Sequence, residues 1–157
     1  MIQLLPVNDT SATNTWKDSY PYAAISAFAL HPIYINLQKV GGKKGAHLIK
    51  ALNKKQKQLN GLAEIDYEQV VHFKVNVLRE LFEIDRFDFL KEDQFKAFFN
   101  DNQNWLVPYA AFCFLRDKYG TSDFSKWKTH SVYNEAEVER LCNPKSKTFT
   151  QIAFHLY

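Results

Sequence analysis

Residues 66–82 read DYEQVVHFKVNVLRELF and show the clearest helical pattern of the chain. Asp66 is placed to cap the first turn, and Gln69 stands where a capping box has its second member. Apolar side chains then recur at the three- and four-residue spacing of one helix face. This stripe consists of Tyr67, Val70, Val71, Val75, Leu78, Leu81 and Phe82. The sequence therefore predicts a helix from about Asp66 to Phe82 with one buried face.

Other segments on both sides of this helix also have helical periodicity. They cover residues 45–59, 90–99, 105–118, 134–141 and 147–157. Asn104 is a candidate cap for the helix over 105–118, Pro108 falls in its first turn, and Gly120 follows as its C-terminal stop. Residues 2–7, IQLLPV, read as a buried strand before a polar loop, and residues 34–37 as a brief strand. We expect a mostly α fold with one short strand at its start.

The composition excludes several classes of protein. A chain of 157 residues with 46% hydrophobic and 15% aromatic residues can bury a core, which argues against disorder. No apolar run reaches the roughly 18 residues that span a bilayer, and the first residues lack the pattern of a secretory signal. The two cysteines and five scattered histidines do not have the spacing of a metal site. We expect a cytoplasmic protein with no membrane partner, no metal and no cofactor.

Lysines are concentrated in one part of the chain. No acidic residue lies between Asp18 and Glu64. The same interval contains seven lysines: Lys39, Lys43, Lys44, Lys50, Lys54, Lys55 and Lys57. Nucleic-acid-binding modules combine such a patch with aromatic side chains, but residues 38–60 contain no Phe, Trp or Tyr. We therefore favour a solvated helix face and expect no nucleic-acid partner. The alternative is a stand-alone helical interaction module whose basic helix, 45–59, binds an acidic protein or a nucleic acid.

One polar stretch is unusual for a helical protein. Residues 8–28 read NDTSATNTWKDSYPYAAISAF and place Trp16, Tyr20 and Tyr22 among amides, hydroxyls and carboxylates. Sugar-binding sites use this mixture, because aromatic faces stack on pyranose rings while polar groups bind hydroxyls. The simpler interpretation is an ordered loop whose aromatic side chains pack against the rest of the protein. Asp9 and Asp18 are the only acids in the stretch, and their spacing alone does not identify a catalytic pair.

Five motifs follow one another along the chain. They are QLLPV at 3–7, DSYPY at 18–22 followed by SAFA at 26–29, IDYEQV at 65–70, WLVPYAAF at 105–112, and QIAFHLY at 151–157. In order and spacing these motifs resemble the 4-α-glucanotransferases (amylomaltase, or disproportionating enzyme) of glycoside hydrolase family 77. The resemblance covers the whole chain.

The resemblance implies a (β/α)₈ barrel with inserted helical subdomains, and a fragment of such an enzyme. Residues 1–37 would be an early barrel strand with its active-site loop, and residues 38–157 the helical subdomain that follows. The enzyme would transfer α-1,4-glucan segments between maltooligosaccharide, starch or glycogen chains by a retaining mechanism. Its catalytic carboxylates would lie beyond Tyr157, in the rest of the same polypeptide. The isolated chain would then contain no catalytic residue and be inactive.

The resemblance also suggests which residues bind the substrate. Tyr22 matches the family tyrosine that stacks on the sugar beside the scissile bond, and Ser19 and Pro21 match its neighbours. Tyr20 is an extra residue inside this motif, so either Ser19 or Tyr20 takes the place of the family serine. The polar pair after the predicted strand is expected to line the site, because barrel enzymes carry function at the C-terminal ends of strands. The expected substrate-binding residues are Tyr22, Ser19, Pro21, Tyr20, Asp9 and Asn8.

Overall fold

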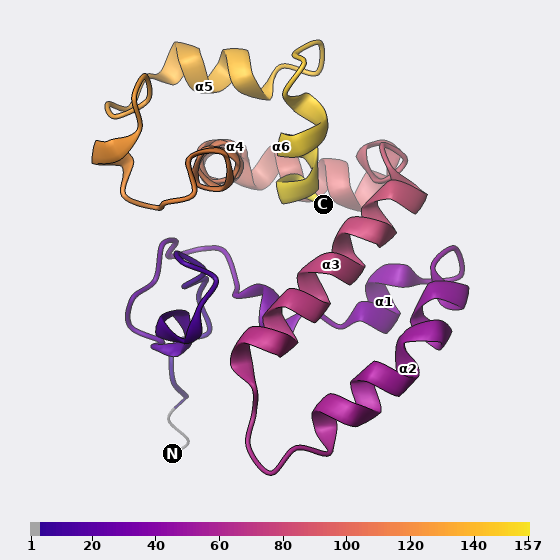
Figure 1. Cartoon of the computed structure of the whole chain (residues 1–157). Coiled ribbons are helices and arrows are strands. Elements are labelled where there is room, and N and C mark those ends of the chain that lie inside the picture. Colours follow the sequence, from indigo (N-terminus) through magenta and orange to yellow (C-terminus); the bar gives the residue numbers. More distant parts are fainter. Residues whose placement is uncertain (1–3) are drawn as a thin grey trace. The chain divides into compact units, whose positions relative to one another are not determined.

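A computed structural model describes residues 4–157 of the chain (Figure 1). This part is mostly helical, as the sequence predicts, and it contains no β-strand. It divides into two compact units, the first ending at Arg86 and the second running from Phe87 to Tyr157. The expected division of a barrel enzyme between residues 37 and 38 stays a prediction, as does the barrel origin of the first residues.

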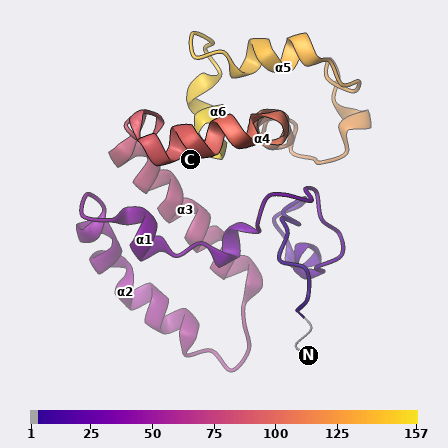
Figure 2. The same cartoon turned by 180° about the vertical axis from the view of Figure 1, so that it is seen from behind.

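The first unit places an irregular N-terminal segment beside three helices. Its elements are the 3₁₀ helices η1 (Trp16–Ser19) and η2 (Pro32–Tyr34) and the α-helices α1 (Leu37–Gly41), α2 (Ala46–Asn60) and α3 (Tyr67–Asp85). Helix α1 packs against α2 and α3, and η1 and η2 pack against α3. The two opposite views show the N-terminal segment beside the start of α3 (Figure 2).

Helix α3 confirms the prediction made for residues 66–82. The Asp66 carboxylate accepts hydrogen bonds from the backbone N–H of Gln69 at 3.0 Å and from its side-chain amide at 2.7 Å. Six residues of the helix are buried, namely Tyr67, Val71, Val77, Leu78, Leu81 and Phe82. Val70 and Val75, which the pattern also assigns to the stripe, are half-buried. The capped end and the buried face together fix where the N-terminal segment can dock.

Helix α2 confirms the prediction for residues 45–59. The brief strand predicted over residues 34–37 is wrong, because the chain forms η2 and then α1 at these positions. The Asn36 side chain caps the first turn of α1 by accepting from the Lys39 N–H at 3.0 Å. Gly41 and Gly45 permit the tight connection from α1 to α2. A side chain at Gly45 would collide with Leu81 and with the backbone of Gly41. Local capping and close packing thus favour helical turns over a strand at residues 34–37.

The buried strand predicted at residues 2–7 is wrong for residues 4–7, and residues 2 and 3 lie outside the described residues. Leu4 and Leu5 are 80% and 63% exposed. The segment makes only an isolated bridge, between Asn8 and Leu30, supported by a hydrogen bond from His31 N–H to the Val7 carbonyl at 3.0 Å. A strand is stable only when a neighbour pairs its backbone groups, and one bridge does not provide this.

The second unit is built around one long helix. Its elements are η3 (Phe89–Lys91), α4 (Asp93–Tyr119), η4 (Phe124–Lys126), α5 (Glu135–Cys142) and α6 (Phe149–Leu156). Helices α5 and α6 confirm the helices predicted over 134–141 and 147–157, and the Asn134 side chain caps α5 by accepting from the Glu137 N–H at 3.0 Å. Helices α4, α5 and α6 pack on one another. Their core consists of Ala110, Phe114, Leu115, Trp127, Leu141 and Ile152.

The two helices predicted over 90–99 and 105–118 are in fact one, α4. Asn104 therefore does not cap a helix start, and Pro108 lies inside the helix instead of in a first turn. Proline has no N–H, so the carbonyl four residues earlier, that of Asn104, loses its usual helical partner. Burial of Leu106 and Ala110 on either side of Pro108 holds the helix together despite this loss. Gly120, with φ of 67°, ends α4 as predicted.

Candidate functional site

The candidate site is the loop that joins Asn8 to His31, and buried Asp18 is its structural centre. Asp18 is 4% exposed. Its carboxylate accepts from the Thr13 N–H at 2.9 Å, from the Thr13 hydroxyl at 2.8 Å and from the Asn14 N–H at 2.6 Å. The turn that these bonds hold contains Asn14 at a positive φ of 57°. The turn before the aromatic motif is therefore fixed by one carboxylate.

The polar pair Asn8 and Asp9 closes the loop from the other side. Asp9 is fully buried, and its carboxylate accepts from the Ser11 N–H at 2.8 Å. Its backbone pairs with Ala29 and with Ile25, each at 2.8 Å. The Asn8 side chain donates to the Ala27 carbonyl at 2.8 Å. Asp9 is thus a structural acceptor in the loop interior, while Asn8 lies half-buried at its surface.

The motif at residues 18–22 presents aromatic rings to solvent. Tyr20 and Tyr22 are 60% and 62% exposed, and their ring centroids lie 5.5 Å apart with planes tilted by 59°. Ser19 is exposed beside them, and Pro21 between them is half-buried. Exposed aromatic rings on a hydrogen-bonded loop offer the faces on which a sugar ring stacks.

The loop is attached to the start of α3 at several points. The Trp16 N–H donates to the Glu68 carboxylate at 2.8 Å, and the indole lies edge-on to Tyr67 with centroids 6.0 Å apart. His31 Nδ1 accepts from the Ile33 N–H at 3.0 Å, so the proton lies on Nε2, which donates to the Tyr67 hydroxyl at 2.7 Å. These contacts connect the loop to a capped helix and reduce its freedom to move.

Burial sets the charge state of these anchoring residues. Burial, reinforced by the negative charge of Asp18, raises the pKa of Tyr67 to about 12. Burial also lowers the pKa of His31, although the carboxylates of Asp9 and Asp18 act in the opposite direction. Both side chains are therefore neutral at pH 7, and the bond between them joins two uncharged groups.

The structure brings the predicted residues into one loop, because the Thr10 hydroxyl donates to the backbone carbonyl of Asp18 and ties the two halves together. Sequence reasoning missed the anchoring pair His31 and Tyr67. Tyr67 reads as one member of an apolar stripe, and 36 residues separate it from His31. No local pattern in the sequence indicates this pair.

The part of the chain that is described contains no group of three or more His, Cys, Asp or Glu residues arranged to hold a metal ion. None of its helices has the length and apolar character that crossing a membrane requires.

Comparison with known proteins identifies the family. The family profile described as 4-alpha-glucanotransferase matches residues 1–157. The rice (Oryza sativa subsp. japonica) protein 4-alpha-glucanotransferase DPE2 is 38% identical over 157 residues, which are 100% of this chain and 16% of the rice protein. The 4-alpha-glucanotransferase of Clostridium butyricum is 29% identical over 140 residues, 88% of this chain and 27% of that protein.

A third relative, the 4-alpha-glucanotransferase of Chlamydia muridarum, is 27% identical over 130 residues, which cover 82% of this chain and 24% of that protein. The chain thus spans about a sixth to about a quarter of the length of these relatives. No solved structure shows a significant match to the chain. Since the profile matches every residue of the sequence, the chain belongs to the 4-alpha-glucanotransferase family of glycoside hydrolase family 77.

Proposed function

We propose that this chain is the part of a cytoplasmic 4-α-glucanotransferase that carries an early barrel strand, its substrate-binding loop and a helical subdomain. The complete enzyme would transfer α-1,4-glucan segments between maltooligosaccharide, starch or glycogen chains. The observation that carries this proposal is the family match over all 157 residues, with relatives that are themselves named 4-alpha-glucanotransferase. The exposed tyrosine pair of the motif at 18–22 supports a role in holding glucan.

In this proposal Tyr22 stacks on the sugar next to the bond that is cleaved, and Tyr20 extends the aromatic surface. The loop holds these rings in place through Asp18 and through its contacts with α3. Such positioning accelerates transfer because a sugar fixed close to the reacting groups needs no further ordering. The loop contributes orientation and binding, and the chemistry is carried by other residues.

Retaining transfer needs a carboxylate nucleophile and a second carboxyl group that acts as acid and base. In the first step the acid protonates the leaving oxygen while the donor sugar's C1 passes from that oxygen to the nucleophile. In the second step the same group, now a base, takes the proton of the acceptor hydroxyl, whose oxygen displaces the nucleophile from C1. Asp9 and Asp18 are buried within the loop and accept backbone hydrogen bonds there, which suits a structural role. We therefore assign the catalytic carboxylates to the rest of the same polypeptide.

The rest of the polypeptide would also account for an exposed apolar surface on the first unit. Leu4, Leu5, Val7, Phe28 and Leu30 are all more than two-fifths exposed. They lie on the two segments that meet at the isolated bridge between Asn8 and Leu30. Isolated proteins rarely leave so many large apolar side chains together in water. We propose that the barrel of the complete enzyme covers this surface.

The alternative of a stand-alone module that binds partners through a basic helix has less support. Lys55 of α2 donates to the Gln69 side chain of α3 at 2.9 Å. Lys44, just before the helix, forms an ion pair with Asp85 at 2.7 Å. Both lysines thus take part in contacts within the first unit, which fits a solvated and internally paired helix face.

The proposal is tested by incubating the complete enzyme, and separately the chain of 157 residues, with maltotriose. We expect the complete enzyme to release glucose and to form longer maltooligosaccharides, and we expect the chain alone to release none. A complete enzyme that leaves maltotriose unchanged, with intact folding shown by circular dichroism, would contradict the proposal. Turnover by the chain alone would disprove the assignment of the catalytic carboxylates to other residues.

A further inference from the structure

The second unit contains a pocket at the C-terminal end of α4. Its volume is about 900 Å³, within the range of small-molecule binding sites. Its walls come from Lys118, from residues 129–130, from the C-terminal half of α5 and from the loop 143–148 that joins α5 to α6 (Figure 1). None of its lining residues belongs to the loop that joins Asn8 to His31, so a ligand here would occupy a separate site.

Basic side chains predominate in the wall of this pocket. Lys118, Arg140, Lys145 and Lys147 line it, together with the single carboxylate of Glu137. The second unit as a whole carries as many acidic as basic residues, so positive charge is concentrated at this place. A concave surface lined by one sign of charge raises the local concentration of ions of the opposite sign.

The one carboxylate of the wall is already paired. Glu137 accepts from Arg140 Nε at 2.7 Å and from Arg140 Nη2 at 2.5 Å, and it lies 3.2 Å from His130 Nε2. The hydrogen bonds from Arg140, with a smaller contribution from His130, lower the pKa of Glu137 to about 2, although desolvation acts in the opposite direction. Glu137 therefore balances Arg140 and leaves the lysines of the wall uncompensated.

The three lysines keep their charge available for a ligand. Within residues 4–157, Lys118, Lys145 and Lys147 form no ion pair with an acidic side chain. The Lys118 ammonium lies 5.6 Å from the Tyr119 ring centroid and 6.0 Å from that of Phe114, contacts that orient it without neutralising it. All three side chains are exposed, so a ligand can reach them.

The loop that carries two of these lysines is fixed by its own hydrogen bonds. The Asn143 side chain accepts from the Lys145 N–H at 2.9 Å. The Thr148 hydroxyl donates to the Leu141 carbonyl at 3.1 Å and ties the end of the loop to α5. The backbone that presents Lys145 and Lys147 is thus ordered before a ligand binds, which lowers the entropic cost of binding.

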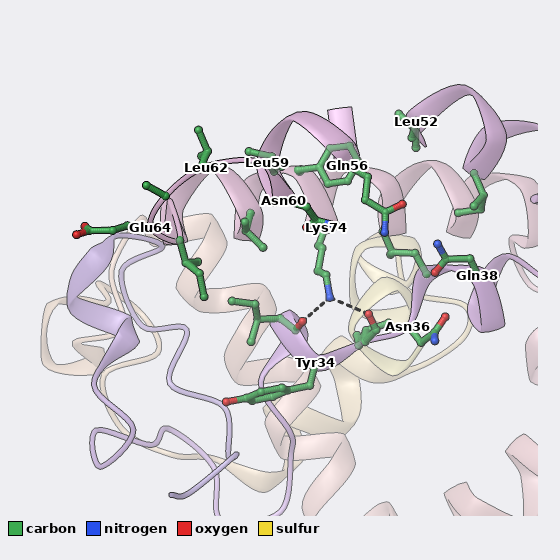
Figure 3. Close-up of a pocket in the computed structure, with 18 residues that line it drawn as sticks. Tyr34, Asn36, Gln38, Leu52, Gln56, Leu59, Asn60, Leu62, Glu64 and Lys74 are labelled. Carbon is green, nitrogen blue, oxygen red and sulfur yellow. Dashed lines mark hydrogen bonds between the residues drawn. The ribbon is translucent and has the colours of Figure 1, made fainter. Parts of the chain in front are cut away.

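The cavity of the first unit shows the opposite balance of charge. Its volume is about 640 Å³, and its charged lining residues are Glu64 and Lys74 (Figure 3). The Lys74 ammonium donates to the Ile33 carbonyl and, at 2.9 Å, to the Ile35 carbonyl, as the dashed lines in Figure 3 show. Because its lysine serves the fold and its charges cancel, we expect no anion to bind in that cavity.

We propose that the pocket of the second unit binds a small phosphate monoester, whose phosphate group is held by Lys118, Lys145 and Lys147. A phosphate monoester carries close to two negative charges and three acceptor oxygens at neutral pH, which suits several ammonium groups better than a singly charged carboxylate does. The volume leaves room for the organic group of the ester. The described lining residues include no Phe, Tyr or Trp, so the bases of a nucleic acid would find no stacking surface.

Lysine labelling of the complete enzyme localises the site. The enzyme is treated with an amine-reactive reagent at pH 8 in phosphate-free buffer, and mass spectrometry measures the labelling rate of each lysine. With millimolar glucose 6-phosphate as the probe, we expect labelling of Lys118, Lys145 and Lys147 to slow several-fold. Lys126 is the internal control, because its side chain is 71% exposed but pairs with Asp123 outside the pocket. Its rate should not change.

Calorimetric titration of the complete enzyme with glucose 6-phosphate measures the contribution of the loop lysines. Lys145→Gln combined with Lys147→Gln should raise the dissociation constant about tenfold, because each exposed ion pair contributes roughly three- to fivefold. The charge-matched control is Lys96→Gln combined with Lys126→Gln, at two exposed positions of the same unit. It should retain the wild-type dissociation constant.

The further arms separate the chemical sources of such an anion. Inorganic phosphate should protect the same lysines more weakly than glucose 6-phosphate, and equal protection would overturn the choice of an ester in favour of the free ion. Glucose should give no protection, and protection by glucose would show that the pocket recognises the sugar and not the phosphate. Absence of protection by glucose 6-phosphate, or an equal loss of affinity in the control variant, would overturn the site itself. These readouts measure binding alone, so they are independent of the transfer assay that tests the proposed function.

Discussion

Replacement of Asp18 by alanine tests whether one carboxylate holds the substrate-binding loop. The substitution removes the acceptor for the N–H groups of Thr13 and Asn14 and for the Thr13 hydroxyl. A buried donor that loses its partner costs about 1–3 kcal/mol. Because Thr13 and Asn14 are exposed, water replaces part of the loss, and we expect the loop to be destabilised by about 2 kcal/mol in total.

Amide hydrogen exchange measures this effect locally. The Asp9 N–H, bonded to Ala29, and the Ile25 N–H, bonded to Asp9, report on closure of the loop. A loss of about 2 kcal/mol corresponds to roughly 30-fold faster exchange at both amides. The matched control is Asp123→Ala, because Asp123 makes a similar local bond to the Ser125 N–H in the second unit. Unchanged exchange in Asp18→Ala, or the same acceleration in the control, would show that the Asp18 carboxylate does not hold the loop.

Two further predictions concern His31 and Pro108. Because burial lowers the pKa of His31, the unfolded loop takes up a proton more readily than the folded loop, so the loop should lose stability as the pH falls below about 6.5. Exchange of the Asp9 amide, corrected for its intrinsic pH dependence, should therefore show weaker protection at pH 5 than at pH 7, and constant protection would contradict this. Pro108→Ala restores a hydrogen bond to the Asn104 carbonyl inside α4 and should stabilise the second unit by about 1–3 kcal/mol, raising its thermal midpoint. A lower midpoint would show that the proline ring is needed for packing.

Elements with local signals could be predicted from the sequence, because their causes lie within a few residues. Asp66 and Asn134 each cap the helix that follows by accepting from the N–H three residues on. Asp66 was predicted as a cap, and the helix over 134–141 was predicted without its cap. The continuity of α4 was not predicted, because residues 100–104, NDNQN, are poor helix formers and Pro108 suggests a helix start. Packing of α4 against α5 and α6 overrides these local preferences.

The site was predictable in its residue types but not in its construction. The aromatic and polar mixture at residues 8–28 and the family resemblance both directed attention to Tyr22. The role of Asp9 as a buried acceptor and the bond between His31 and Tyr67 depend on the docking of the loop onto α3. Such contacts between distant parts of the chain leave no periodic pattern in the sequence.

The most direct test of the account is the kcat/KM of maltotriose disproportionation by the complete enzyme carrying Tyr22→Ala. Tyr133→Ala is the control, since Tyr133 is 66% exposed but lies in the second unit, outside the loop. If Tyr22 positions the sugar beside the cleaved bond, kcat/KM should fall by at least about tenfold, while the control retains the wild-type value. Wild-type kinetics in Tyr22→Ala would show that the exposed tyrosine pair does not belong to the substrate site.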